Sequence, residues 1–270
     1  MSSDTLTIGN TTIPKVGLGT YKLTGPDAVK SIEDALQMGY RHIDTAQIYG
    51  NEEEVGKAIK NSGISRDEIF ITTKVWPADF KGLIPAVEQS LKKLQMDRVD
   101  LLLLHWPSDD EANKTGAELL YEAMRNGYAK NVGVSNFNIE QIEKARQIAP
   151  IICNQVEYHP YLSQKKMLFY LKEYDMFLTA YRPLAMGQVA KDEMLLDIAA
   201  KHKKTAGQIA LRWMVQQPNV VVIPKTTHHE RLIENLNIFD FEISEEEMAA
   251  IFALNKNERL TNPATAPKWD

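Results

Sequence analysis

Four side chains in the first half of the sequence could together form a proton-donating group: those of Asp44, Tyr49, Lys74 and His105. A free tyrosine has a pKa of about 10 and is a poor acid near neutrality. A lysine ammonium within hydrogen-bonding distance favours the phenolate and would lower that pKa by roughly 1–3 units. Asp44 would keep Lys74 charged, and His105 could place a substrate oxygen against Tyr49. The chemistry would be proton transfer to a carbonyl oxygen, contributing about 10²–10⁴ in rate, while a hydride arrives at the carbon.

Each of these residues also has an ordinary structural interpretation. Asp44 could anchor a turn, Tyr49 could pack with an exposed hydroxyl, and His105 could be a core histidine with satisfied hydrogen bonds. Lys74 is harder to explain in this way, because a lysine half-buried at the end of a strand needs a carboxylate partner. The catalytic interpretation therefore depends on whether the fold brings the four side chains together.

Eight short apolar segments alternate with amphipathic segments along the chain. They predict strands near 16–19, 41–45, 69–74, 100–105, 132–136, 151–157, 177–181 and 220–225. Alternating strands and helices require a parallel sheet, and eight such units in a chain of this length predict a (β/α)8 barrel, an α/β fold of the TIM type. A β-hairpin over 6–13 would precede it, extra helices would follow the last two strands, and residues 1–270 would form one domain. The predicted ends of three strands carry Asp44, Lys74 and His105, where barrels place active sites.

Four predicted helix starts carry a capping pair, in which Asn, Ser or Thr is followed three residues later by Glu or Gln. The pairs are Asn51 with Glu54, Thr205 with Gln208, Thr227 with Glu230, and Ser244 with Glu247. The segment 261–270 has two prolines and no periodicity. We therefore expect it to lie as an irregular strip over the barrel.

A doubly wound open sheet is the alternative α/β fold, and it binds dinucleotides through a G-x-G-x-x-G turn. Gly17-Leu18-Gly19 continues to Lys22 at the position of the third glycine. This difference excludes the fingerprint.

Composition disfavours several other classes of protein. The net charge of −5 disfavours a nucleic-acid or anionic-membrane role. No apolar run is long enough to span a membrane, and Met1-Ser2-Ser3-Asp4 lacks the features of a signal peptide, so we expect a cytoplasmic protein. The single cysteine, Cys153, lies in an apolar segment and predicts a buried core residue rather than a nucleophile.

A second polar group surrounds the helix start that follows the last predicted strand. Lys225, Arg231 and two histidines at a helix N-terminus would attract an anion, and barrels often bind phosphate after the eighth strand. The alternative is an ordinary charged helix start with Arg231 in solvent. Elsewhere, Tyr181 could stack on a flat ring, and a carboxamide could be bonded by Ser135, Asn136 and Gln155.

Through longer motifs around these residues the chain resembles an aldo-keto reductase over nearly its whole length. The motifs are Gly39-Tyr40-Arg41-His42-Ile43-Asp44-Thr45-Ala46 with Tyr49, Thr72-Thr73-Lys74-Val75-Trp76, Leu104-His105-Trp106-Pro107, Gly133-Val134-Ser135-Asn136-Phe137, Asn154-Gln155-Val156-Glu157 and Ile223-Pro224-Lys225. The short chain and its end, with Arg259-Leu260 and Pro267-Lys268-Trp269-Asp270, are most similar to the bacterial 2,5-diketo-D-gluconate reductases of the B type.

The resemblance implies an NADPH-dependent carbonyl reductase, less active with NADH, for which it suggests methylglyoxal and 2,5-diketo-D-gluconate as substrates. It implies that Tyr49 donates the proton, Lys74 lowers the pKa of Tyr49, Asp44 pairs with Lys74, and His105 orients the carbonyl. The implied cofactor contacts are Thr20, Ser135, Asn136, Gln155, Tyr181, Arg182, Leu184, Lys225, Thr226, Thr227, His228, Arg231, Glu234 and Asn235. The implied substrate mouth is lined by Tyr21, Trp76 and Trp106. No metal is implied.

The sequence departs from the family pattern at three places. Arg182 stands where the family usually has Ser, which puts a side-chain contact with the pyrophosphate in doubt. His228 stands where many relatives have Arg, so we expect a modest preference for NADPH over NADH. The segment 108–113 and the C-terminal tail are short, so we expect an open site that selects mainly against bulk.

Two other functions remain as alternatives. A nucleotide-binding, redox-sensing subunit with slow turnover would need an oligomeric interface, and no large insertion provides one, so a monomer is the default. A metal-dependent or sugar-phosphate barrel enzyme ranks last, because the adjacent His228 and His229 do not easily face one metal.

Overall fold

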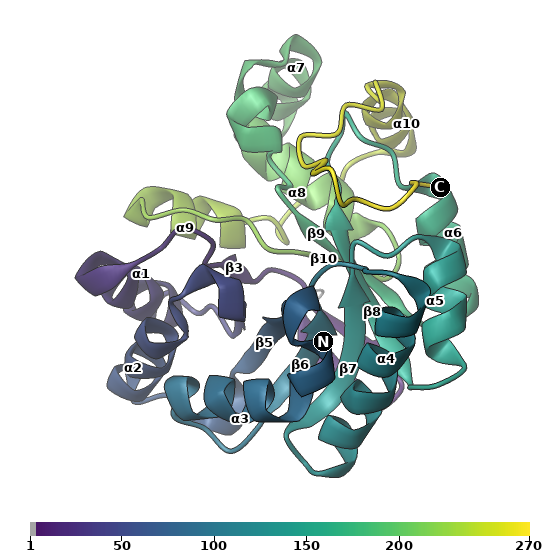
Figure 1. The fold of residues 1–270 in the computed structure, drawn as a ribbon. Helices are drawn as coiled ribbons and strands as arrows, with labels where there is room; N and C mark the ends of the chain where they lie inside the picture. Colours follow the sequence, from purple (N-terminus) through teal and green to yellow (C-terminus); the bar gives the residue numbers. More distant parts are fainter. Residues whose placement is uncertain (1–3) are drawn as a thin grey trace.

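The computed structural model describes residues 4–270; the segment 1–3, on which part of the signal-peptide expectation rests, lies outside the described residues. Eight parallel strands pair in the order β10-β9-β8-β7-β6-β5-β4-β3, so each strand lies beside its neighbour in sequence (Figure 1). They are β3 (Leu18–Gly19), β4 (His42–Asp44), β5 (Phe70–Val75), β6 (Val99–Leu104), β7 (Ala129–Ser135), β8 (Ile151–Glu157), β9 (Phe177–Tyr181) and β10 (Val220–Val222). A parallel bridge between Val16 and Val222 closes the ring. The predicted (β/α)8 barrel is confirmed.

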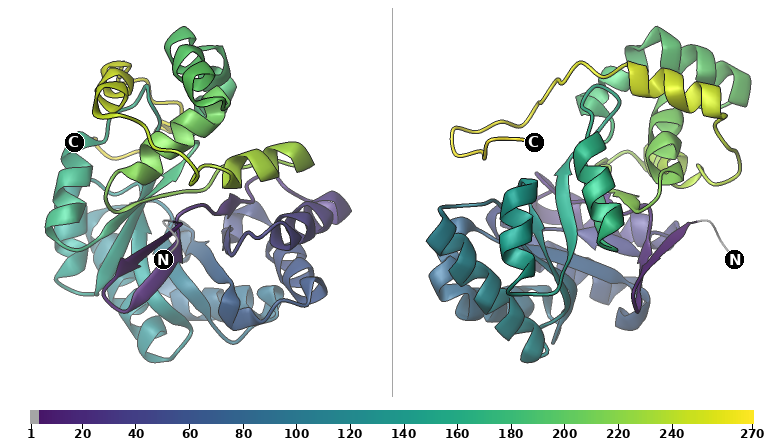
Figure 2. Two further views of the ribbon diagram at one scale, coloured as in Figure 1. Left: turned by 180° about the vertical axis from the view of Figure 1, so that it is seen from behind. Right: turned by 90° about the vertical axis from the view of Figure 1, so that its right-hand side faces the viewer.

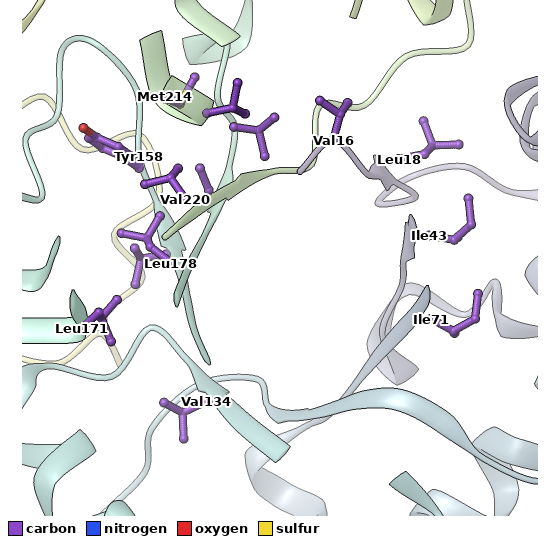
Figure 3. Close-up of a cluster of buried hydrophobic side chains, with 14 of the residues drawn as sticks. Val16, Leu18, Ile43, Ile71, Val134, Tyr158, Leu171, Leu178, Met214 and Val220 are labelled. Carbon is purple, nitrogen blue, oxygen red and sulfur yellow. The ribbon is translucent and has the colours of Figure 1, made fainter. Parts of the chain in front are cut away.

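Helices lie between the strands and cover the outside of the barrel (Figure 2). None of the helices in residues 4–270 is long and apolar enough to cross a membrane. They are α1 (Gly25–Gln37), α2 (Glu52–Ser62), α3 (Leu83–Leu94), α4 (Asp110–Arg125), α5 (Ile139–Arg146), α6 (Lys165–Glu173), α7 (Glu193–His202), α8 (Ala206–Gln216), α9 (His229–Leu236) and α10 (Glu245–Ala253). The central strands β5 and β6 are buried along their whole length, because both faces of the sheet are covered. Figure 3 shows outward side chains such as Leu18, Ile43 and Ile71, which belong to the core packed under the helices.

The predicted N-terminal hairpin is present as β1 (Thr5–Ile8) and β2 (Thr11–Pro14). Its Ile8 and Ile13 pack against inward-facing strand residues, among them Phe70 and Cys153. Cys153 is fully buried, as its apolar neighbours indicated.

Two of the four predicted capping pairs are confirmed, those beginning at Thr205 and Ser244. The other two are wrong. Asn51 precedes α2 but makes no capping bond, because its Oδ1 accepts from Thr45 Oγ1 at 2.8 Å while its Nδ2 donates to the carbonyl oxygens of Thr20 and Leu23. The residue before α9 is His228 rather than Thr227, and its side chain makes no capping bond.

The last strand is shorter than predicted, since β10 ends at Val222 rather than at Lys225. Pro224 has no N–H to continue the pairing. Its carbonyl oxygen still accepts a hydrogen bond from the Gly19 N–H, at 3.2 Å. Lys225 therefore lies in the loop before α9.

Replacement of Gly56 by alanine is expected to destabilise the protein by about 1–3 kcal/mol, because α2 and α3 approach closely at this glycine. A Cβ added there would lie 2.9 Å from Cα of Leu94 and closer still to its carbonyl group. Urea unfolding measures the effect. Gly82→Ala is the matched control, since nothing lies within 4 Å of a Cβ at that position. Equal stability of the two variants would contradict this account of the helix contact.

Candidate active site

The four predicted catalytic residues meet at the carboxyl ends of three adjacent strands. Asp44 is the last residue of β4, Lys74 lies one residue before the end of β5, and His105 follows β6 directly. Tyr49 ends the short 3-10 helix η1 (Gln47–Tyr49), after which Gly50 turns the chain with φ of 67°. The parallel pairing of β4, β5 and β6 places these strand ends side by side.

Lys74 lies at the centre of the group and is fully buried. Its Nζ donates to Asp44 Oδ1 at 2.6 Å, to the Thr45 carbonyl oxygen at 2.7 Å and to the Tyr49 hydroxyl at 3.4 Å. The other carboxylate oxygen of Asp44 accepts from Gln155 Nε2 at 2.7 Å. All three ammonium donors are therefore used, which fixes Lys74 beside the tyrosine hydroxyl.

Aromatic rings form the wall around the Tyr49 hydroxyl. The Tyr49 ring centroid lies 5.0 Å from that of Tyr21 and 5.5 Å from that of His105. Trp76 meets His105 edge-on at 5.3 Å. Tyr21 is exposed and Trp76 half-buried, whereas Trp106 is almost completely buried. The three predicted mouth residues follow the ends of β3, β5 and β6, and we call them the aromatic rim.

Burial has the largest effect on the pKa values of Tyr49 and Lys74. Burial first, and then the Asp44 carboxylate, raise the pKa of Tyr49 well above its ordinary value. Burial sets this net direction, and the lowering of the pKa by Lys74 that the resemblance implies stays a prediction. Burial also lowers the pKa of Lys74, although Asp44 opposes that shift. The three hydrogen bonds that Lys74 Nζ donates match an ammonium, so we describe the group as a neutral phenol beside an ammonium.

His105 is held as a neutral imidazole. Burial, followed by the Lys74 charge, lowers the pKa of His105 well below 6.5. Its Nδ1 is buried without a hydrogen-bond partner among the described residues. A buried donor without a partner is costly, so we assign the proton to Nε2. His105 can then donate one hydrogen bond into the mouth.

The predicted carboxamide-binding residues lie beside this group and hydrogen-bond one another. Asn136 Nδ2 donates to the His105 carbonyl oxygen at 3.1 Å and to Ser135 Oγ at 3.0 Å. The Tyr181 hydroxyl donates to Asn136 Oδ1 at 2.8 Å. Gln155 differs in one respect from the expectation, because its amide nitrogen is used by Asp44.

Three further predicted cofactor residues follow the ends of β3 and β9. Thr20 is buried, and its hydroxyl donates to the Asp44 carbonyl oxygen at 2.9 Å. Leu184 is half-buried before the irregular helix η4 (Ala185–Lys191). Arg182 has φ of 51°, and its guanidinium donates to the Leu260 carbonyl oxygen at 3.2 Å. The side chain of Arg182 is therefore directed to the C-terminal tail.

The remaining predicted cofactor residues lie around the start of α9. Lys225, Thr227, His228 and Arg231 are exposed. Thr226 is buried, and its Oγ1 accepts from the His228 N–H at 3.0 Å. Farther along the helix, Glu234 is half-buried and Asn235 is buried. This second cluster is an exposed cationic surface at a helix N-terminus, which suits an anion.

Sequence reasoning missed the contribution of the C-terminal segment 255–270, here called the strap. The strap crosses the molecule from α10 toward α5 without regular structure, as the Pro-containing tail indicated (Figure 2). Both oxygens of the buried Glu157 accept its backbone N–H groups, at Leu260 and Thr261. Trp269 lies 6.3 Å from Trp106, ring to ring, so the strap reaches the rim. No periodic pattern marked these contacts.

Among residues 4–270, no cluster of three or more His, Cys, Asp or Glu side chains is placed to hold a metal ion. The arrangement instead combines a phenol, an ammonium and a neutral imidazole around one opening. Such a group can donate a proton to an oxygen atom that is placed between Tyr49 and His105.

Comparisons with protein families, with individual proteins and with solved structures agree with one another. The sequence profile of the Aldo/keto reductase family matches residues 15–256. A glyoxal reductase from Bacillus subtilis (strain 168) is 46% identical over 92% of this chain and 91% of its own length. The methylglyoxal reductase DkgB of Escherichia coli O157:H7 is 42% identical over 96% of this chain and 99% of its own. A solved structure assigned as a 2,5-diketo-D-gluconic acid reductase B has a TM-score of 0.97 at 45% identity, covering 100% of this chain and 98% of that one.

Proposed function

The chain belongs to the aldo/keto reductase family, and on that premise we propose that it is an NADPH-dependent reductase of small aldehydes and ketones. The observation that carries the proposal is the contact of the buried Lys74 ammonium with both the Asp44 carboxylate and the Tyr49 hydroxyl. We further propose that residues 1–270 act as one cytoplasmic, monomeric catalytic domain.

In this proposal Tyr49 is the general acid. His105 Nε2 donates a hydrogen bond to the substrate carbonyl oxygen and holds that oxygen toward the Tyr49 hydroxyl. As negative charge develops on the oxygen, Tyr49 transfers its proton, and the Lys74 ammonium stabilises the phenolate that forms. Because burial raises the pKa of Tyr49, the phenol keeps its proton until negative charge develops on the substrate oxygen.

The residues near Tyr181 and α9 fit a nicotinamide dinucleotide phosphate. The half-buried Tyr181 ring, fixed by Asn136, offers a flat surface for a nicotinamide. The exposed Lys225 and Arg231 at the start of α9 offer charge for a phosphate. When bound, the reduced nicotinamide would supply the hydride. His228 stands where many relatives have an arginine, which would bind a phosphate more strongly than a neutral imidazole. We therefore propose that the preference for NADPH over NADH is modest.

The substrate mouth fits small carbonyl compounds. Its lining is the aromatic rim of Tyr21, Trp76 and Trp106, and the segment that follows Trp106 is short before α4 begins at Asp110. The related proteins from Bacillus subtilis and Escherichia coli are named for glyoxal and methylglyoxal. These names support methylglyoxal as a substrate. The description of the structural relative as a 2,5-diketo-D-gluconic acid reductase B supports 2,5-diketo-D-gluconate as a second substrate.

The proposal is tested by NADPH oxidation with methylglyoxal and with 2,5-diketo-D-gluconate, each repeated with NADH. We expect turnover with both substrates and a higher kcat/KM with NADPH than with NADH. Tight NADPH binding without reduction of either compound would contradict the proposal and would favour a nucleotide-sensing subunit.

The pH profile provides a separate prediction. We expect kcat to fall on the alkaline side at a pH below 10.5, the ordinary pKa of lysine, because burial lowers the pKa of Lys74. Deprotonation removes the charge that stabilises the phenolate, whereas the phenol, whose pKa is raised, stays protonated. On the acid side we expect no break near 6.5, since the pKa of His105 lies well below that value.

Steady-state rates at saturating cofactor and carbonyl substrate measure this profile, with circular dichroism at each pH to confirm that the protein remains folded. An acid limb centred near 6.5, or an alkaline limb above 10.5, would contradict the assigned charge states.

A further inference from the structure

A polar cavity of about 390 Å³ lies between the strap and the ends of β7 and β8. Phe137 and Val156, which follow the predicted carboxamide-binding residues, form its apolar floor, and Arg259 and Trp269 of the strap form its outer wall. The cavity is distinct from the Tyr49 group, because none of the four proposed catalytic residues lines it.

Arg259 is the unusual feature of this cavity. Its guanidinium lies 3.6 Å above the Trp269 ring centroid. Nη1 is buried and has no hydrogen-bond partner among the described residues, and burial lowers the pKa of the group. Two carboxylates act on this guanidinium through their charge, those of Glu157 and Asp270. Glu157 binds backbone N–H groups of the strap with both oxygens, and Asp270 accepts the Ile139 N–H. A guanidinium that is stacked but unpaired is arranged to receive an anion, and its planar N–H groups match a carboxylate.

The other polar groups of the lining suit hydroxyls. The Asp270 carboxylate accepts the Ile139 N–H at 3.2 and 3.1 Å and keeps further lone pairs that can accept from a hydroxyl. Amide and hydroxyl groups complete the wall, on Ser163, Gln164, Asn257 and Asn262. One cation, one carboxylate and several neutral polar groups together exclude a purely apolar ligand and disfavour a polyanion.

We propose that this cavity is a binding site for a small polyhydroxy carboxylate, that is, a sugar acid, held through its carboxylate by Arg259 and through its hydroxyls by Asp270 and the neutral polar groups. The volume lies within the range of small-molecule sites. Because Trp269 walls the cavity on one side and approaches Trp106 on the other, an occupied site fixes the strap at the rim. The proposed binding of a sugar acid does not depend on the proposed reductase function. Only the effect of that binding on the rate of carbonyl reduction depends on it.

The test is calorimetric titration of the intact protein with sodium D-gluconate, with sorbitol as a neutral polyol of the same length. We expect gluconate to bind with a Kd on the order of a millimolar and sorbitol about tenfold or more weakly. Arg259→Gln is expected to weaken gluconate binding by about tenfold or more. The matched control is Lys268→Gln, which removes an exposed strap cation outside the cavity and should leave the Kd unchanged.

Two further arms locate the ligand and guard against misfolding. Arg259→Lys keeps the charge without the planar fork and should give an intermediate loss, even if Arg259→Gln disturbs the strap. Gluconate should change the rate of methylglyoxal reduction without competing with methylglyoxal. Absence of gluconate binding, equal binding of sorbitol, or competitive inhibition that Arg259→Gln leaves intact would each overturn the proposal. Calorimetry reports binding even if no carbonyl compound is reduced, so the two proposals fail separately.

Discussion

Tyr49→Phe is expected to lower kcat for methylglyoxal reduction by about 10²–10⁴-fold, the contribution of a positioned general acid. The substitution removes only the hydroxyl, which is the group that accepts from Lys74 Nζ. The ring keeps its contacts with Tyr21 and His105, so the rim should be unchanged. Cofactor binding should persist, because Tyr181 and the α9 cluster do not involve Tyr49. Steady-state NADPH oxidation and a fluorescence titration with NADPH measure the two quantities.

Tyr21→Phe is the matched control for this experiment. It removes a second hydroxyl from the same rim, on a side chain that is 49% exposed, whereas Lys74 Nζ donates to Asp44, Thr45 and Tyr49. We expect its kcat to stay within about threefold of the parent value. If Tyr49→Phe kept most of the activity while Tyr21→Phe lost it, the proton donor would have to be reassigned to Tyr21.

The convergence of the four proposed catalytic residues was predictable because it depends on local patterns and on topology. Apolar segments that end at Asp44, Lys74 and His105 alternate with helices, and parallel pairing then requires their ends to lie on one side of the barrel. The short segment between β4 and α2 keeps Tyr49 within reach of those ends. None of these steps needs knowledge of side-chain packing.

The properties that were not predictable depend on contacts between distant segments. The pKa of Tyr49 rises because water is excluded by several elements at once, and no local pattern reports that exclusion. Asn51 looks like a helix cap, but its Oδ1 accepts from the Thr45 hydroxyl and its Nδ2 donates to carbonyl groups of the segment after β3. Gln155 binds Asp44 across the barrel. For the same reason the role of Trp269 at the rim was missed, since the strap has no periodicity that could position it.

Lys74→Met is expected to lower the free energy of unfolding by about 3–5 kcal/mol, in addition to removing activity. The Lys74 and Asp44 side chains are 0% and 2% exposed, so the substitution leaves a buried carboxylate with Gln155 as its only described side-chain partner. Methionine has nearly the same length as lysine, which separates the loss of charge from the creation of a cavity. Urea unfolding measures the change, and Lys92→Met, at an exposed position of α3, is the control with little expected effect.

The double variant Asp44→Asn with Lys74→Met separates the structural and chemical contributions of the pair. A neutral amide can still accept from Gln155, and no unpaired charge remains buried, so most of the lost stability should return. Turnover should not return, because the proposed mechanism needs the ammonium beside Tyr49. Recovery of stability without activity would mean that the buried pair is kept for proton transfer rather than for folding, which agrees with the direction in which burial shifts the pKa of Lys74. Recovery of both would show that the charge of Lys74 is dispensable for the reaction.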